Sequence, residues 1–108
     1  MAYLLGYDIG SSSIKATLLE AETGKVVASF TSPEDTELDM AVPEPGWAEQ
    51  DPENWWKHIK AATAGIKNKS GANLHDVKAI GIAYQMHGLV LVDKDLRVLR
   101  PAIIWCDS

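Results

Sequence analysis

Residues 3–18 read YLLGYDIGSSSIKATL and contain two strand patterns joined by a turn. The apolar run at residues 3–7 predicts a buried strand that ends at Asp8. Turn-forming residues follow at 10–12, and from Ser13 onward polar and apolar side chains alternate with a period of two. This stretch therefore predicts two strands that form a hairpin.

A third strand and a long connection follow this hairpin. Residues 22–25 predict a turn and residues 26–31 a strand, so the chain is expected to open with an antiparallel meander of three strands. Residues 32–50 contain three prolines and little periodicity, which predicts an ordered but irregular connection.

A helix is predicted to begin after Asp51 and to close at residues 70–71. Asp51 can cap free backbone amides, Pro52 suits the first helical position, and glycine at position 71 is typical of a helix end. Four apolar residues at spacings of four, three and four form one stripe, and its tryptophan is expected to pack on the meander. The stripe consists of Trp55, Ile59, Ala62 and Ile66.

Three apolar runs follow the helix. Residues 77–84 and 89–92 predict two further strands, and residues 102–105 form a last apolar run that enters a polar end. Three strands, a helix and then more strands predict a mixed α/β layered fold and not a doubly wound parallel sheet.

The composition limits the class of protein. A chain of 108 residues fits one domain, and its net charge of -5 makes nucleic acid or an anionic membrane an unsuitable partner. No apolar run approaches the roughly 20 residues of a membrane helix. The single cysteine excludes an internal disulfide, and the prediction is a cytoplasmic location. The chain stops inside a strand-like run, so we expect it to be a piece of a longer protein.

The first candidate site is the turn of the hairpin. A carboxylate at a strand end, followed by glycine and three serines, can face a metal-bound polyphosphate: the amides and hydroxyls donate hydrogen bonds, and Asp8 can hold Mg²⁺ through water. The alternative is a plain hairpin turn, and this segment alone favours that alternative. The loop residues are Gly10, Ser11, Ser12 and Ser13.

The second candidate site is the polar interruption after the strand at residues 77–84. Gln85 and His87 could bind sugar hydroxyls, and Met86 could pack on the apolar face of a small ligand. Trp105 and Asp107, an aromatic ring and a carboxylate at a strand end, would suit a polyol. The alternative is again an ordinary turn.

Other residues receive simpler interpretations. His58 and His75 are expected at the surface, and no cluster of histidines and acids has the spacing of a metal site. The block at residues 46–56 contains three tryptophans; packing is favoured for Trp55, and Trp47 stays open between packing and sugar stacking.

Together, these segments resemble the start of the FGGY family of carbohydrate kinases, most closely its xylulokinase branch. The resemblance covers nearly the whole chain and is carried by DIGSSSIK at 8–15, WAEQDPENWW at 47–56, GIAYQMHG at 81–88 and IWCD at 104–107. It implies an actin-like (ribonuclease H-like) α/β domain, of which residues 1–108 would be part of the N-terminal one, with a mixed sheet and an antiparallel three-stranded start.

The resemblance also implies a reaction and its residues. ATP would phosphorylate a sugar, with D-xylulose 5-phosphate as the product and Mg²⁺ as the metal. Asp8 would act near the Mg²⁺-nucleotide, and the loop at 10–13 with Lys15 would lie close to the phosphates. The sugar would be contacted by Gln85, Met86, His87, Trp105 and Asp107.

Several alternatives remain open. The family's catalytic base aspartate is expected beyond residue 108, so the isolated chain is expected to be inactive. A gluconokinase or another sugar or polyol kinase of the family is the second hypothesis. A non-catalytic actin-like module that binds a nucleotide or a protein is the third. The resemblance leaves a homodimer of the full-length protein open.

Overall fold

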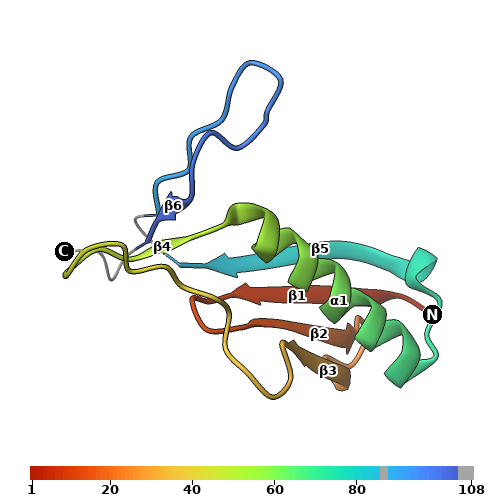
Figure 1. Cartoon of the computed structure of the whole chain (residues 1–108). Helices are drawn as coiled ribbons and strands as arrows, with labels where there is room; N and C mark the ends of the chain where they lie inside the picture. The colour runs from red at the N-terminus through yellow and green to blue at the C-terminus, as the bar shows by residue number, and fades with distance from the viewer. Residues whose placement is uncertain (86–87, 105–108) are drawn as a thin grey trace.

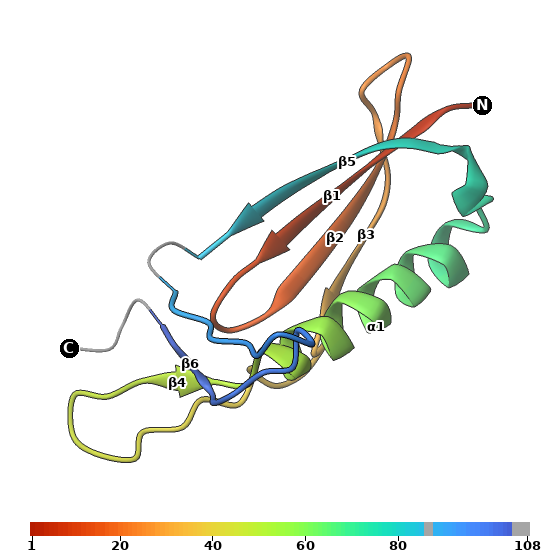
Figure 2. The same cartoon turned by 90° about the horizontal axis from the view of Figure 1, so that it is seen from above.

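A computed structural model describes residues 1–85 and 88–104 of the chain. One four-stranded mixed sheet is covered on one face by one long helix, and the two lie as separate layers (Figure 1, Figure 2). The strand order across the sheet is β3-β2-β1-β5. The predicted mixed α/β layered fold is confirmed.

The predicted meander is confirmed as β1 (Tyr3–Ile9), β2 (Ile14–Glu20) and β3 (Val26–Ser32). All neighbouring pairs are antiparallel. The alternation of side chains places Ile14, Ala16 and Leu18 on the helix-facing side, where each is 0% exposed. β1 continues to Ile9, so Asp8 lies inside the ladder opposite Lys15 and not behind the strand.

The helix α1 (Pro52–Ser70) has the predicted bounds. At its start the Asp51 side chain accepts a hydrogen bond of 3.0 Å from the Glu53 backbone amide. At its end Gly71 adopts φ +66°, and its amide donates to the Lys67 carbonyl. Local capping chemistry thus sets both ends of the helix.

The apolar stripe of α1 packs on the meander as predicted. Ala62 and Ile66 are fully buried, and Trp55 packs partly buried against the same core. Gly65 lies against the ring of Phe30 from β3, and a Cβ atom at this position would collide with the ring. Glycine is therefore what allows the helix to approach β3 so closely.

The strand β5 (Val77–Tyr84) follows the short 3-10 turn η1 (Leu74–Asp76) and pairs with β1 in parallel. The strand itself agrees with the prediction. β5 is an edge strand of the sheet, and almost all of its residues are exposed.

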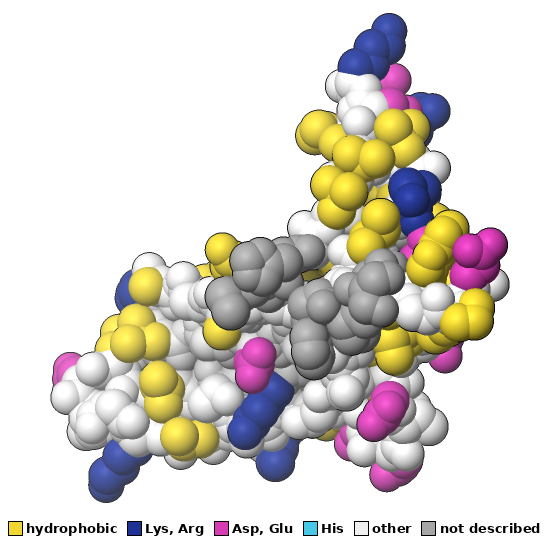
Figure 3. All heavy atoms as spheres, turned by 90° about the vertical axis from the view of Figure 1, so that its left-hand side faces the viewer, with side chains coloured by type: hydrophobic (Ala, Val, Ile, Leu, Met, Phe, Trp, Pro, Cys, Tyr) yellow, Lys and Arg dark blue, Asp and Glu magenta, His cyan; other side chains and the backbone are white. Residues whose placement is uncertain are grey.

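The predicted strand at residues 89–92 is wrong. Leu89 and Val92 make only isolated bridges, to Ile103 and Val98, and the segment folds back on itself in a narrow arm that projects from the sheet (Figure 1). Apolar side chains on the arm are largely exposed, with Lys and Arg at its tip (Figure 3). The run is no strand of the main sheet because its pairing within the described residues is limited to these isolated bridges.

A small second sheet lies at the base of the arm, where β4 (Glu49–Gln50) pairs with β6 (Ala102–Ile103). Next to it Ala48, Ala102 and Ile104 form a minor core that Trp55 also contacts. Glu49 forms an ion pair with Arg100. Among the helices in the described ranges, none is long and apolar enough to cross a membrane.

Candidate functional site

The candidate site lies at the edge of the sheet where β1 and β5 end. The two strands are parallel, with Ile9 opposite Tyr84, so their carboxyl ends meet at one edge. The Gln85 backbone amide continues the ladder by donating to the Ile9 carbonyl at 3.1 Å. Ligands of sheets with parallel strands commonly bind at such an edge. The start of the loop at 10–13 and Gln85 thus follow directly on neighbouring strand ends.

The loop at residues 10–13 is held by its backbone carbonyls. Ser13 O accepts from the Gly10 amide at 3.0 Å, Ser12 O from the Leu38 amide at 2.7 Å, and Ser11 O from the Gln50 side-chain amide at 2.6 Å. Within residues 1–85 and 88–104, no hydrogen bond occupies the three serine hydroxyls. The carbonyl oxygens of the loop are thus already hydrogen-bonded, whereas its hydroxyl groups, within the same ranges, are free to donate to a ligand. This arrangement suits the binding of an anion.

Gly10 lies at the tightest point of this loop. A Cβ atom at this position would lie 3.2 Å from the Ser13 carbonyl oxygen, the same oxygen that the Gly10 amide binds. A side chain at this position would require the Ser13 carbonyl to shift by a few tenths of an ångström.

Asp8 and Lys15 lie opposite each other on β1 and β2, on the face of the sheet away from α1. Both are exposed, and with Thr17 they line a shallow cavity of about 310 Å³. Among the described residues the only ion pair joins Arg100 and Glu49, so neither Asp8 nor Lys15 is neutralised by a close partner. A carboxylate and an ammonium group are therefore available beside the loop.

One residue that the sequence did not single out holds the site together. Gln50, only 3% exposed, accepts hydrogen bonds on its side-chain oxygen from the Trp55 indole at 2.9 Å and from the Gln85 amide at 3.3 Å. Its amide nitrogen binds the hairpin loop at Ser11 O. The segment at 46–56 was interpreted through its tryptophans, its helix cap and the family resemblance, none of which assigns a role to Gln50. The available signal was a polar residue directly before the cap at Asp51.

Within the described ranges, the side-chain amide of Gln85 forms a hydrogen bond through its nitrogen but not through its oxygen. Its Oε1 is buried and has no hydrogen-bond partner among the described residues. Gln85 also lines a cavity of about 320 Å³ together with Ile9, Trp55, Tyr84, Gly88 and Val90. A buried acceptor beside a cavity is suited to a ligand that carries a hydroxyl or amino donor.

The predicted site residues divide into two groups. Asp8, Lys15, Gln85 and the loop at 10–13 gather at one edge of the sheet. Met86, His87, Trp105 and Asp107 lie outside the described residues, so their predicted roles stay predictions. The loop at 10–13 consists of Gly10, Ser11, Ser12 and Ser13.

His58, which was expected at the surface, lies between α1 and the end of β3. His58 is half-buried and its Nδ1 lies 2.8 Å from the Ser32 hydroxyl, so it joins α1 to the end of β3 and is no simple surface side chain. The cause is the close approach of the helix to that strand. Trp47 is 44% exposed, and His75 is exposed as predicted.

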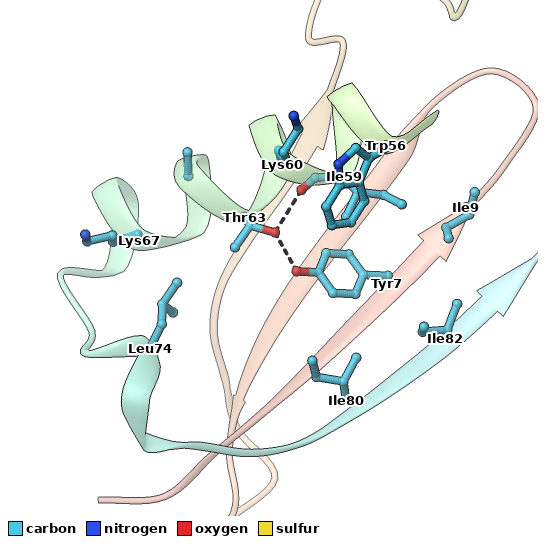
Figure 4. A pocket seen from close by; sticks show the side chains of 11 residues that line it. Tyr7, Ile9, Trp56, Ile59, Lys60, Thr63, Lys67, Leu74, Ile80 and Ile82 are labelled. Carbon is cyan, nitrogen blue, oxygen red and sulfur yellow. Dashed lines mark hydrogen bonds between the residues drawn. The ribbon is translucent and has the colours of Figure 1, made fainter. Parts of the chain in front are cut away.

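A larger cavity of about 580 Å³ lies elsewhere, between α1 and the open strand β5 (Figure 4). Its lining is mostly apolar, with Trp56 on one side and Ile80 and Ile82 on the other. At its floor the Tyr7 hydroxyl is 2.5 Å from Thr63 Oγ1, and the Thr63 hydroxyl donates to the Ile59 carbonyl. No predicted site residue lines this cavity, and Ile9 is the residue that it shares with the cavity beside Gln85.

The described residues fit a magnesium ion held mainly by phosphates. They contain no group of three or more His, Cys, Asp or Glu side chains that could hold a metal by themselves. Magnesium is commonly bound by one or two carboxylates together with substrate phosphates and water. The exposed carboxylate of Asp8 beside the loop meets that requirement.

Comparison with known proteins agrees with this geometry. Residues 3–108 match the model of the N-terminal domain of the FGGY family of carbohydrate kinases. A xylulose kinase from Klebsiella pneumoniae is 50% identical over 106 residues, which are 96% of this chain and 20% of that protein. The chain therefore spans about a fifth of the length of the relatives that it matches.

Solved structures show the same fold. A xyloylose kinase from Brucella ovis superposes with a TM-score of 0.89 at 38% identity, over 98% of this chain and 21% of the other. A gluconate kinase from Lactobacillus acidophilus has a TM-score of 0.83 at 26% identity, over 98% of this chain and 20% of the other.

Proposed function

The chain belongs to the FGGY family of carbohydrate kinases, and from this we propose that the full-length protein transfers the γ-phosphate of ATP to a sugar hydroxyl. The fold is the first portion of an actin-like, ribonuclease H-like domain. D-Xylulose is the proposed sugar and D-xylulose 5-phosphate the product, because relatives that are 50% and 47% identical to the chain are named xylulose kinases. Residues 1–108 would form part of the N-terminal domain.

The observation that carries the proposal is the meeting of two half-sites at one edge of the sheet. The loop at 10–13 presents serine hydroxyls free of described partners, and the amide of Gln85 lies at the end of the neighbouring strand. Phosphoryl transfer needs a phosphate site and a hydroxyl site held next to each other, because most of the catalysis is positioning. The serine loop and Gln85, side by side at this edge, support the proposal that it provides both.

On the phosphate side we assign the nucleotide to the loop at 10–13 with Asp8 and Lys15. The loop hydroxyls would donate hydrogen bonds to phosphate oxygens, and the Lys15 ammonium would add a positive charge. Asp8 would hold Mg²⁺ through water, and the bound ion would neutralise charge on the β- and γ-phosphates.

On the sugar side we assign Gln85 together with the predicted contacts Met86, His87, Trp105 and Asp107. The unpartnered oxygen of Gln85 supports this, since a sugar hydroxyl would supply the missing donor. The aspartate that accepts the proton of the attacking hydroxyl is proposed to lie elsewhere in the full-length protein.

The test is a kinase assay on the full-length protein with ATP, Mg²⁺ and each of D-xylulose, D-gluconate and glycerol. We expect ADP and sugar phosphate to form with the highest kcat/KM on D-xylulose, and residues 1–108 alone to be inactive. Faster turnover on gluconate would favour the second candidate, which the structural likeness to a gluconate kinase supports. Nucleotide binding without phosphate transfer to any sugar would instead indicate a non-catalytic module.

A further inference from the structure

The proposed phosphate loop and the proposed sugar contact are joined by a single side chain. Gln50 binds Ser11 O with its amide nitrogen and the Gln85 amide with its oxygen. These partners lie 39 and 35 residues away in the sequence. Resting on the function proposed above, we propose that Gln50 is a positioning residue that couples the two half-sites and sets which atom of Gln85 is offered to the sugar.

The orientation of Gln50 follows from its neighbours. Ser11 O is an acceptor, so it must face the amide nitrogen of Gln50. The Trp55 indole is only a donor, so it must face the oxygen. A flipped Gln50 amide would set oxygen against oxygen and N–H against N–H. One donor and one acceptor on opposite sides therefore lock the amide in a single orientation.

This locked amide in turn orients Gln85. The oxygen of Gln50 can only accept, so Gln85 must direct its nitrogen toward Gln50. The backbone of Gln85 is already fixed by its bond to Ile9 O. Gln85 Oε1 is consequently turned away from Gln50 and left without a partner among the described residues. The group that it can bind is a donor such as a sugar hydroxyl.

Burial gives this network its effect. Gln50 is 3% exposed, so water cannot readily replace a hydrogen bond that it loses. Removing its amide leaves the Ser11 carbonyl without its side-chain donor and frees the Gln85 amide to rotate. A change at Gln50 is therefore expected to disturb the phosphate side and the sugar side together.

The experiment is a double-mutant cycle in the full-length protein with Gln50→Leu, Gln85→Leu and both. We expect each single change to raise the KM for the sugar about tenfold. We expect the double variant to stay near tenfold, because Gln50 acts on the sugar through Gln85, whereas independent effects would multiply to about a hundredfold. Gln50→Leu should also raise the KM for ATP, and Gln85→Leu should not.

The matched control is Asn68→Leu, which replaces an exposed amide near the end of α1 and should leave both KM values unchanged. Gln50→Asn, which keeps the amide on a shorter side chain, covers the case in which Gln50→Leu does not fold. It should weaken the same two KM values. A multiplicative double variant, or unchanged KM values in a folded Gln50 variant, overturns the inference.

A readout without catalysis separates this inference from the proposed function. Hydrogen exchange of the full-length protein should be faster in the Gln50 variant than in Asn68→Leu, both at residues 10–13 and at Gln85. If the unmodified protein phosphorylates no sugar but the two segments respond together, the proposed function fails and the coupling by Gln50 stands. If only one segment responds, the coupling fails.

Discussion

The two halves of the sheet carry similar apolar residues and have opposite burial. On β2, Ile14 and Leu18 are fully buried, whereas on β5 Ile80 and Ile82 are each 58% exposed. The difference is the position of α1, which packs on β2 and β3 and leaves β5 bare. Apolar character therefore makes a strand, and a covering layer decides whether the strand is part of a core.

The largest difference between the covered and the open half is expected when one apolar side chain on each is truncated. In the chain of residues 1–108, Leu18→Ala should lower the free energy of unfolding by about 3 kcal/mol, because it opens a cavity in the closed core. The matched change Ile82→Ala on the open half should cost about 0.5 kcal/mol or less. Urea unfolding measures both values, and equal costs would refute the division into two halves.

A smaller effect is expected from adding one methyl group to each half. Gly65→Ala should destabilise the chain by about 2 kcal/mol, since its Cβ meets the Phe30 ring between α1 and β3. Gly81→Ala on β5 has no atom within 4 Å of the new Cβ and should change stability by less than about 0.5 kcal/mol. Thermal unfolding of both variants checks this, and a tolerated Gly65→Ala would mean that the helix lies farther from β3.

The smallest effect concerns the helix that makes one half closed. Asp51→Ala removes the acceptor of the Glu53 amide at the start of α1 and should cost about 1 kcal/mol. Asp51→Asn keeps a side-chain oxygen that can cap the helix and should cost a few tenths of that. Chemical denaturation of the two variants separates capping from charge, and an equal loss in both would assign the effect to charge.

Local signals in the sequence predicted the meander and the helix well. Turn residues, alternation and the caps at Asp51 and Gly71 act within a few residues, so they can be read without the tertiary structure. The place of β5 beside β1 and its exposure could not be read in this way, because both depend on the partners of the strand. The error at residues 89–92 has the same origin.

The residues of the candidate site also differ in whether local sequence signals or distant partners determine their role. Asp8, the serine loop and Gln85 could be found because their chemistry lies at predicted strand ends. Gln50 was missed, since Ser11 and Gln85, the two partners that it joins, lie more than thirty residues away in the sequence. Long-range hydrogen bonds between polar residues leave no periodicity in the sequence.

The hold on the loop at residues 10–13 has a consequence for protein engineering. The loop is fixed by main-chain carbonyls, and every amino acid carries such a carbonyl whatever its side chain. Ser11 and Ser12 can therefore be exchanged for threonine, alanine or cysteine while the path of the backbone is kept. The side chains at the tip of the hairpin, and with them the groups offered to a ligand, can therefore be replaced without redesigning the β1–β2 hairpin.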